Sequence, residues 1–165
     1  MPDSVFSGLR WQEENSSQVT LLSETVKDWL FWQGSLTVKL KQCCTKFEVK
    51  VQSEKWIKKT YQNETALLPQ GQYWCREVIL YGDDKPWVEA RTLISPLLAE
   101  RYQELLQLGT MPIGEWLFRQ APGRRTIQWS QDEKTGLYAR RSLFLIRQMP
   151  LLISELFLED SPITK

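Results

Sequence analysis

Histidine is absent from the 165 residues of this chain. Its absence removes the commonest general base, the commonest metal ligand and every serine-histidine or cysteine-histidine nucleophile pair. Cysteine is scarce, with three residues, of which Cys43 and Cys44 are adjacent. These cysteines suggest neither a disulfide framework nor a transition-metal cluster, and packing thiols in a reducing compartment are the favoured interpretation. If the protein is an enzyme, carboxylates and arginines must carry its chemistry.

The chain also has no large excess of positive or negative charge and no long apolar run. The balance of 21 basic and 20 acidic residues gives no global field that would attract nucleic acid or acidic membranes. Residues 1–14 lack the pattern of a signal peptide, and the longest apolar stretch is too short to span a bilayer. No glycine-rich phosphate loop or dinucleotide fingerprint is present. We therefore expect a cytoplasmic protein with no metal, no nucleic-acid partner and no membrane insertion.

The hydrophobic pattern predicts one α+β domain over residues 1–165. The chain is 42% hydrophobic and 25% charged, and it contains no internal repeat and no linker rich in proline, glycine or serine. Runs joined by short turns should pair antiparallel, which gives a sheet of about six strands with helices on one face. The expected helices are 21–32, 35–42, 96–108 and one within 110–118; the expected strands are 47–52 with an extension towards 57, 73–81, 86–94, 124–130, 138–147 and 151–158.

Glu155 is the one carboxylate in the apolar run 151–158. Strand alternation places it on the same face as Leu151, Ile153 and Phe157, in the core or in a cavity within the core. Burying an ionised carboxylate without a partner costs on the order of several kcal/mol after the protein relaxes. Glu155 should therefore be neutral, paired or lining a cavity. A different register, with Glu155 on a solvated face, is about equally compatible with the run alone.

The two β-prone runs on either side of the turn 82–85 suggest a second group of charges. If the turn closes with Tyr81 opposite Pro86, Arg76 lies directly opposite Arg91 on the same apolar face. Two opposed arginines require nearby anions, and a guanidinium binds a carboxylate in bidentate fashion. The anion is either Glu155, in a structural salt-bridge network, or a small organic dianion. Strand alternation should send one of Arg140 and Arg141 inward and the other towards solvent. A solvated strand edge, with Arg124 and Arg125 nearby, is the favoured interpretation, and neither receives a catalytic role.

Five segments together resemble the chorismate lyase family over nearly the whole chain. They are YWCRE at 73–77, PWVEART at 86–92, LGTMPIG at 108–114, GLYARRS at 136–142 and PLLISELFL at 150–158. The resemblance implies a single domain with a six-stranded antiparallel β-sheet and a ligand cavity enclosed under helical flaps. It also implies conversion of chorismate to 4-hydroxybenzoate and pyruvate, the first step of ubiquinone biosynthesis, without a cofactor. We expect the protein to be a monomer.

The resemblance assigns roles to particular residues. Arg76 matches the arginine that binds the ring carboxylate, and Glu155 matches the glutamate that meets the 4-hydroxyl. Leu36 and Ile113 match positions that line the ligand, although the family commonly has methionine at the position of Leu36. Where this chain has Ala90 and Ala139, the bacterial pattern has glycine.

The expected chemistry is an elimination that aromatises the ring, which is why no metal, flavin or nucleotide is needed. We expect Arg76 to anchor the ring carboxylate, and Arg91 to neutralise the enolpyruvyl group and stabilise its departing oxygen. Glu155 either acts as a general acid or base or only orients the 4-hydroxyl. The product keeps both recognised groups, so its release should be slow.

Two other classes of function remain as alternatives. The same fold occurs in effector-sensing domains of bacterial transcription regulators, which bind small molecules without converting them. Those domains normally follow a winged-helix domain, which residues 1–20 could not form. A structural or protein-binding module is supported only by the eight tryptophans, which a protein for small aromatic ligands would also contain.

Overall fold

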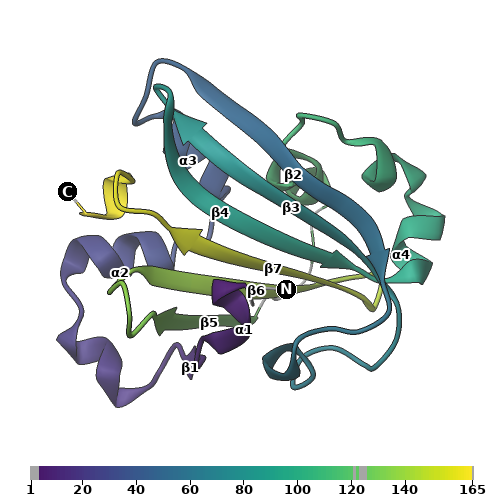
Figure 1. Cartoon of the computed structure of the whole chain (residues 1–165), viewed down its shortest axis with the longest axis horizontal. Coiled ribbons are helices and arrows are strands. Elements are labelled where there is room, and N and C mark those ends of the chain that lie inside the picture. Colours follow the sequence, from purple (N-terminus) through teal and green to yellow (C-terminus); the bar gives the residue numbers. More distant parts are fainter. Residues whose placement is uncertain (1–3, 121, 123–125, 165) are drawn as a thin grey trace.

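The computed structural model describes residues 4–120, 122 and 126–164 and has an antiparallel sheet of seven strands (Figure 1). The strand order is β1-β5-β6-β7-β4-β3-β2. The strands are β1 (Gln12–Glu13), β2 (Phe47–Ile57), β3 (Tyr73–Gly82), β4 (Lys85–Ile94), β5 (Thr126–Gln131), β6 (Tyr138–Ile146) and β7 (Met149–Phe157). The expected number was six. The additional strand β1 pairs with β5 at the sheet edge and is too short to show a hydrophobic period.

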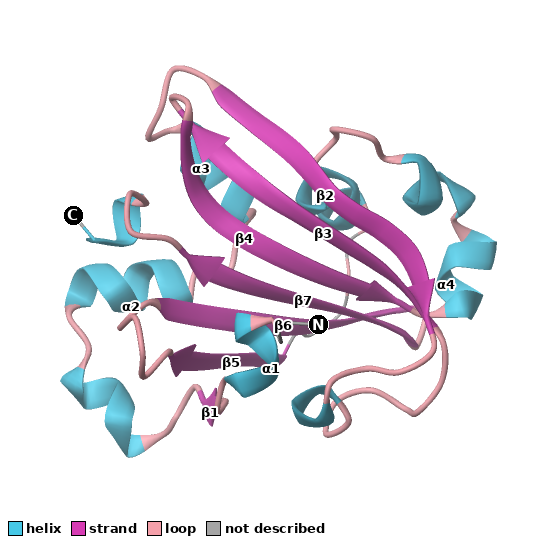
Figure 2. Cartoon of the chain, in the orientation of Figure 1, coloured by secondary structure: helices cyan, strands magenta, loops and turns pink. Residues whose placement is uncertain are grey.

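The α-helices divide unequally between the two faces of the sheet (Figures 1 and 2). They are α1 (Val5–Gly8), α2 (Glu24–Leu30), α3 (Leu36–Lys41), α4 (Pro96–Arg101) and α5 (Ile113–Arg119). Helices α2 to α5 pack on one face, where Trp29 contributes to the same core cluster as Phe157. Helix α1 packs on the other face, where Phe6 clusters with Leu156. The prediction that all helices lie on one face therefore holds except for α1.

Serine side chains cap four of these helices: Ser4 caps α1, and Ser23, Ser35 and Ser95 cap α2, α3 and α4. The hydroxyl oxygens of Ser23, Ser35 and Ser95 accept hydrogen bonds from the backbone N–H three residues later, at 3.2, 3.3 and 3.4 Å. Each bond satisfies a donor that has no partner within its helix. The N-caps predicted at Ser23 and Ser35 are confirmed.

The helix expected over 96–108 is divided into α4 and the 3₁₀ helix η3 (Gln103–Gln107). Tyr102 leaves the helical conformation between them, and its ring packs edge-on against Trp116 at 5.3 Å between centroids. Glu104 then accepts a hydrogen bond from the indole N–H of Trp116 at 3.1 Å. Both contacts join the segment around the break to α5. Over the described ranges, no helix is both long and apolar enough to cross a membrane.

The hairpin β3–β4 closes as predicted at its turn but not along its length. Tyr81 pairs with Pro86, and Leu80 pairs with Val88, so Trp87 is an extra residue in β4. A Cβ atom on Gly82 would lie 2.3 Å from the ring of Trp87. The missing side chain of Gly82 therefore makes room for the indole, and the resulting β-bulge shifts the register by one residue.

This shift overturns the predicted pairing of the two arginines. Arg76 pairs with Thr92, and Arg91 pairs with Glu77. Because side chains alternate along a strand, Arg76 and Arg91 point to opposite faces of the sheet.

Candidate active site

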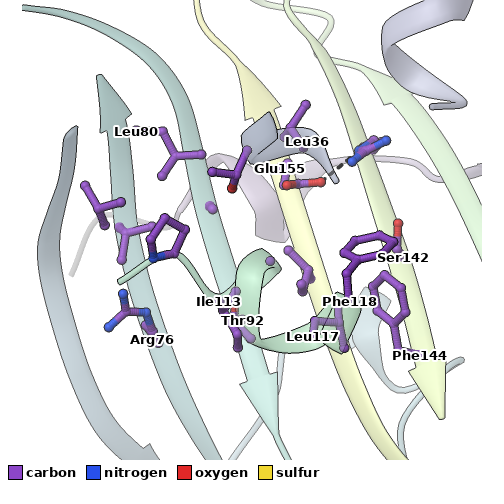
Figure 3. Close-up of a pocket in the computed structure, with 18 residues that line it drawn as sticks. Leu36, Arg76, Leu80, Thr92, Ile113, Leu117, Phe118, Ser142, Phe144 and Glu155 are labelled. Carbon is purple, nitrogen blue, oxygen red and sulfur yellow. Dashed lines mark hydrogen bonds and ion pairs between the residues drawn. The ribbon is translucent and has the colours of Figure 1, made fainter. Parts of the chain in front are cut away.

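A cavity lies between the sheet and helices α3 and α5 (Figure 3). The side chains of β2, β3, β4, β6 and β7 that point to this face form its floor, and residues of α3, α5 and the turn before α5 line the opposite side. Most of the side chains that line the cavity are apolar. The polar side chains that line it are Thr37, Arg76, Thr92, Arg140, Ser142 and Glu155. Two cations and one carboxylate therefore face a largely apolar enclosure.

Arg76 occupies one end of the cavity and is only 2% exposed. Its Nη2 donates to the carbonyl oxygens of Gly109 and Met111 at 2.9 and 3.0 Å, in the segment that leads into α5. Its Nη1 donates to Glu54 Oε2 at 3.2 Å. A β-bulge in β2 between Val51 and Ser53 brings Glu54 opposite Arg76. An arginine has five N–H donors in a planar fork, so donors remain for a ligand carboxylate.

Glu155 lies farther along the floor, and its carboxylate pairs with Arg140, as the dashed line in Figure 3 shows. Arg140 Nε donates to Glu155 Oε1 at 2.8 Å, and the pairing of β6 with β7 places the two residues directly opposite. The side chains are 3% and 11% exposed, respectively. Glu155 is therefore paired and lines a cavity, which agrees with the sequence-based expectation. Its partner, however, is Arg140 and neither Arg76 nor Arg91.

Arg91 lies on the other face of the sheet, away from the cavity. Its Nε and Nη2 donate to the two carboxylate oxygens of Glu64 at 2.9 and 3.0 Å, and its guanidinium carbon lies 3.9 Å from the ring centroid of Tyr61. Desolvation by burial is the largest single effect and lowers the pKa of Arg91. The hydrogen bonds to Glu64 and the nearby charges of Cys75, Glu64 and Tyr61 together outweigh it, so the net pKa is raised. The expectation that Arg91 stabilises a departing oxygen does not agree with this position.

Arg140 and Arg141 are both buried, which corrects the interpretation of a solvated strand edge. They point to opposite faces of β6. On the face away from the cavity, Arg141 donates to the side-chain oxygen of Gln128 at 2.7 Å and to the carbonyl oxygen of Asn63 at 2.8 Å. Desolvation by burial lowers the pKa of Arg141 to about 10. Arg140 therefore belongs to the cavity, and Arg141 belongs to the packing of the opposite face.

Four of the five predicted site residues lie around one cavity, namely Leu36, Arg76, Ile113 and Glu155. Arg91 is the exception. The sequence interpretation considered Arg140 but favoured a solvated strand edge for it, and the β6–β7 turn contains no glycine, asparagine or aspartate that would have indicated its register. Arg147 and Gln148 instead adopt positive φ angles of 51° and 68°, and this two-residue turn aligns Arg140 with Glu155. Within the described part of the chain, no three cysteine, aspartate or glutamate side chains cluster in a way that suits a metal ion.

The largely apolar lining and the separated charges suit a small anion that also carries a hydrogen-bonding group. A family model described as chorismate lyase matches residues 5–165. The chain is 39% identical to the chorismate pyruvate-lyase of Sodalis glossinidius, over 97% of this chain and 90% of that protein. It is 38% identical to the probable chorismate pyruvate-lyase of Bartonella bacilliformis, over 98% of this chain and 94% of that protein. The chain belongs to the chorismate lyase family.

A more distant likeness concerns the fold alone. The crystal structure of a possible transcriptional regulator, YydK from Bacillus subtilis, superimposes with a TM-score of 0.52 at 10% sequence identity. The match covers 68% of this chain and 58% of that chain. The α+β arrangement is therefore shared with a protein of different printed description, and the fold by itself does not identify an activity.

Proposed function

We propose that the protein is a chorismate lyase that eliminates pyruvate from chorismate and releases 4-hydroxybenzoate. The observation that carries this proposal is the placement of Arg76 and Glu155 at separate positions along one apolar cavity. Chorismate has a carboxylate on one end of its ring and a hydroxyl on the opposite end. Family membership supports the same activity.

In this proposal Arg76 binds the ring carboxylate through donors that its protein partners leave available. Only one carboxylate oxygen of Glu155 is bonded to Arg140, so the other can accept a hydrogen bond from the 4-hydroxyl and orient it. Leu36 and Ile113 pack against the ring from the side of the covering helices. A site with a fixed cation at one end and a hydrogen-bonding carboxylate at the other selects for para-substituted rings.

The reaction breaks the bond between C3 and the enolpyruvyl oxygen and removes the proton from C4. The electrons of that C–H bond complete an aromatic ring, and the enolpyruvate takes up a proton on its methylene carbon to become pyruvate. Aromatisation supplies the driving force, so the proposal includes no cofactor. Glu155 is the carboxylate in the cavity that can accept or donate a proton. Arg91 is not included, because its guanidinium is bonded to Glu64 on the other face.

Helices α3 and α5 are the flaps in this proposal. Arg76 is bonded to the segment before α5, and Arg140 is bonded to the carbonyl oxygen of Trp32, in the segment between α2 and α3. Both charged ends of the cavity therefore hold the chain that covers them. Since 4-hydroxybenzoate retains the carboxylate and the hydroxyl, its departure requires this cover to move, and product release should limit turnover.

The wider assignment follows from the same family. The protein is proposed to work as a single domain and a monomer in the cytoplasm, where it supplies 4-hydroxybenzoate for ubiquinone biosynthesis. The three cysteines, Cys43, Cys44 and Cys75, are all free, which is compatible with a reducing compartment. Its partners are the substrate and the product, without nucleic acid.

The test is to mix the purified, metal-stripped protein with chorismate and to follow 4-hydroxybenzoate by absorbance and chromatography. Turnover by the native chain, and its loss in an Arg76→Ala variant that remains folded, is the expected result. Binding of chorismate without turnover would favour a non-catalytic effector-binding domain of the same fold. Neither binding nor turnover would overturn both assignments.

A further inference from the structure

Arg140 is the buried charge of the cavity that the proposed function does not yet explain. It is 2% exposed and lies in β6, directly opposite Glu155 in β7. Its Nε donates to Glu155 Oε1 at 2.8 Å. No hydrogen bond to the second oxygen, Oε2, is found within the described residues, although Glu155 lines the cavity. One oxygen of Glu155 is thus held by the protein, and the other remains for a ligand.

The same guanidinium also binds one carbonyl in the last turn of helix α2 and one just beyond its end. Its Nη1 donates to the carbonyl oxygens of Trp32 at 3.1 Å and Trp29 at 3.4 Å. Carbonyl groups at a helix C-terminus have no partner within the helix and carry partial negative charge. Helix α3 begins at Leu36, shortly after these carbonyls, and Leu36 and Thr37 line the cavity. Arg140 therefore connects Glu155 to the segment that leads into the cavity cover.

We propose that Arg140 is the positioning residue for Glu155 and that it sets the selectivity of the site for a hydroxyl para to the bound carboxylate. This inference rests on the proposed function, because it assumes that Glu155 meets the 4-hydroxyl. The planar guanidinium holds Oε1 on one side and the α2 carbonyls on another, so it fixes both the position and the orientation of the carboxylate. A lysine ammonium would keep the charge but lacks the planar arrangement of donors that bonds the carboxylate and the carbonyls at the same time.

A purely structural ion pair would behave differently. Its loss would loosen the cavity and weaken all ligands alike, whether or not they carry a hydroxyl. A positioning role predicts a selective effect, because benzoate retains the carboxylate for Arg76 but offers nothing to Glu155. The ratio of the dissociation constants of benzoate and 4-hydroxybenzoate therefore separates the two roles.

The experiment measures both ligands by calorimetry on the native chain and on Arg140→Gln, Glu155→Gln and the double variant. The native chain should prefer 4-hydroxybenzoate by at least tenfold, about the effect of a single hydrogen bond to a charged group. Arg140→Gln and Glu155→Gln should each reduce this preference to within about twofold of unity, and the double variant should reduce it no further, because both act on one contact. Benzoate affinity should change little.

Arg141→Gln is the matched control. Arg141 is the next residue of the same strand and is equally buried, but it points to the opposite face. This variant should keep the native preference even where its melting temperature falls. If Arg140→Gln does not fold, Arg140→Lys takes its place, with at least a threefold reduction in the preference expected.

An unchanged preference in a folded Arg140 variant overturns the inference and leaves the proposed function intact. Equal weakening of both ligands overturns it too, since it indicates a structural role alone. If the native chain binds neither ligand, the proposed function fails, and the inference fails with it.

Discussion

Each face of the sheet carries a buried glutamate paired with an arginine, and the two pairs differ in their surroundings. Glu64 and Arg91 are 2% and 4% exposed, and both oxygens of Glu64 are bonded to the guanidinium. Glu155 and Arg140 are also buried, but one bond joins them and Glu155 borders a cavity. The first pair is saturated by its own partners. The second pair keeps an oxygen for a ligand, and this difference separates a structural ion pair from a site for chemistry.

The largest effect on activity should come from the pair beside the cavity. Glu155→Gln removes the carboxylate but keeps a side-chain oxygen for Arg140, so the variant should fold. We expect kcat/KM for chorismate to fall by about 100-fold or more, which is the lower range for loss of a general acid or base. Steady-state formation of 4-hydroxybenzoate measures this. Near-native turnover by the variant would place the essential carboxylate elsewhere.

The largest effect on stability should come from the other pair. Glu64→Gln leaves Arg91 buried without its carboxylate, and breaking such a pair costs about 3–5 kcal/mol. Denaturant unfolding should show this loss, while turnover per folded molecule at low temperature remains near native. Glu48→Gln is the control, because Glu48 pairs with Lys46 at the surface and such pairs contribute about 0–1 kcal/mol. A large loss of turnover in folded Glu64→Gln would link the two faces functionally.

The bulge that separates the two arginines should be sensitive to a single methyl group. Gly82→Ala would place a Cβ atom 2.3 Å from the ring of Trp87, and overpacking of this kind costs about 1–3 kcal/mol. The free energy of unfolding, compared with that of Gly8→Ala, measures this effect. Among the described residues, and apart from its chain neighbours and the backbone of its own helix, no heavy atom lies within 4 Å of a Cβ atom on Gly8. Equal stability of the two variants would show that Gly82 is not what accommodates the indole.

The smallest effect concerns the thiol beside the saturated pair. Burial raises the pKa of Cys75 from its ordinary value of 9.0 to about 11. Between pH 9 and about 11 the folded thiol keeps a proton that the unfolded thiol has released. The free energy of unfolding should therefore decrease as the pH rises through this range. At pH 8.5, iodoacetamide should label Cys43, which is exposed, and leave Cys75 unlabelled until the chain unfolds. Peptide mass spectrometry follows both sites. Labelling of Cys75 at the rate of Cys43 would show that this face opens readily.

Local signals predicted the elements of this fold well. Serine caps marked the starts of α2 and α3, and the apolar positions Leu36 and Leu40 identified the buried side of α3. Alternation identified β2 and β7, including the inward position of Glu155. These features depend on residues close in sequence, whose spacing is visible without the structure.

Features that depend on register could not be predicted in the same way. The bulge at Trp87 shifts one strand by a single residue, which moves Arg91 to the opposite face. The β6–β7 turn uses Arg147 and Gln148 at positive φ, where glycine or asparagine would have announced it. The partner of Arg91, Glu64, belongs to the 3₁₀ helix η2 (Gln62–Glu64), for which the sequence offered no expectation. Pairs of charges across strands therefore required the structure.

The most direct test of the account is a crystal structure of the chain with 4-hydroxybenzoate. We predict one product molecule between the sheet and helices α3 and α5, with its carboxylate on Arg76 and its hydroxyl within hydrogen-bond distance of the Glu155 oxygen that Arg140 does not hold. A product molecule in the reverse orientation, or bound outside this cavity, would contradict the assignment of these two residues.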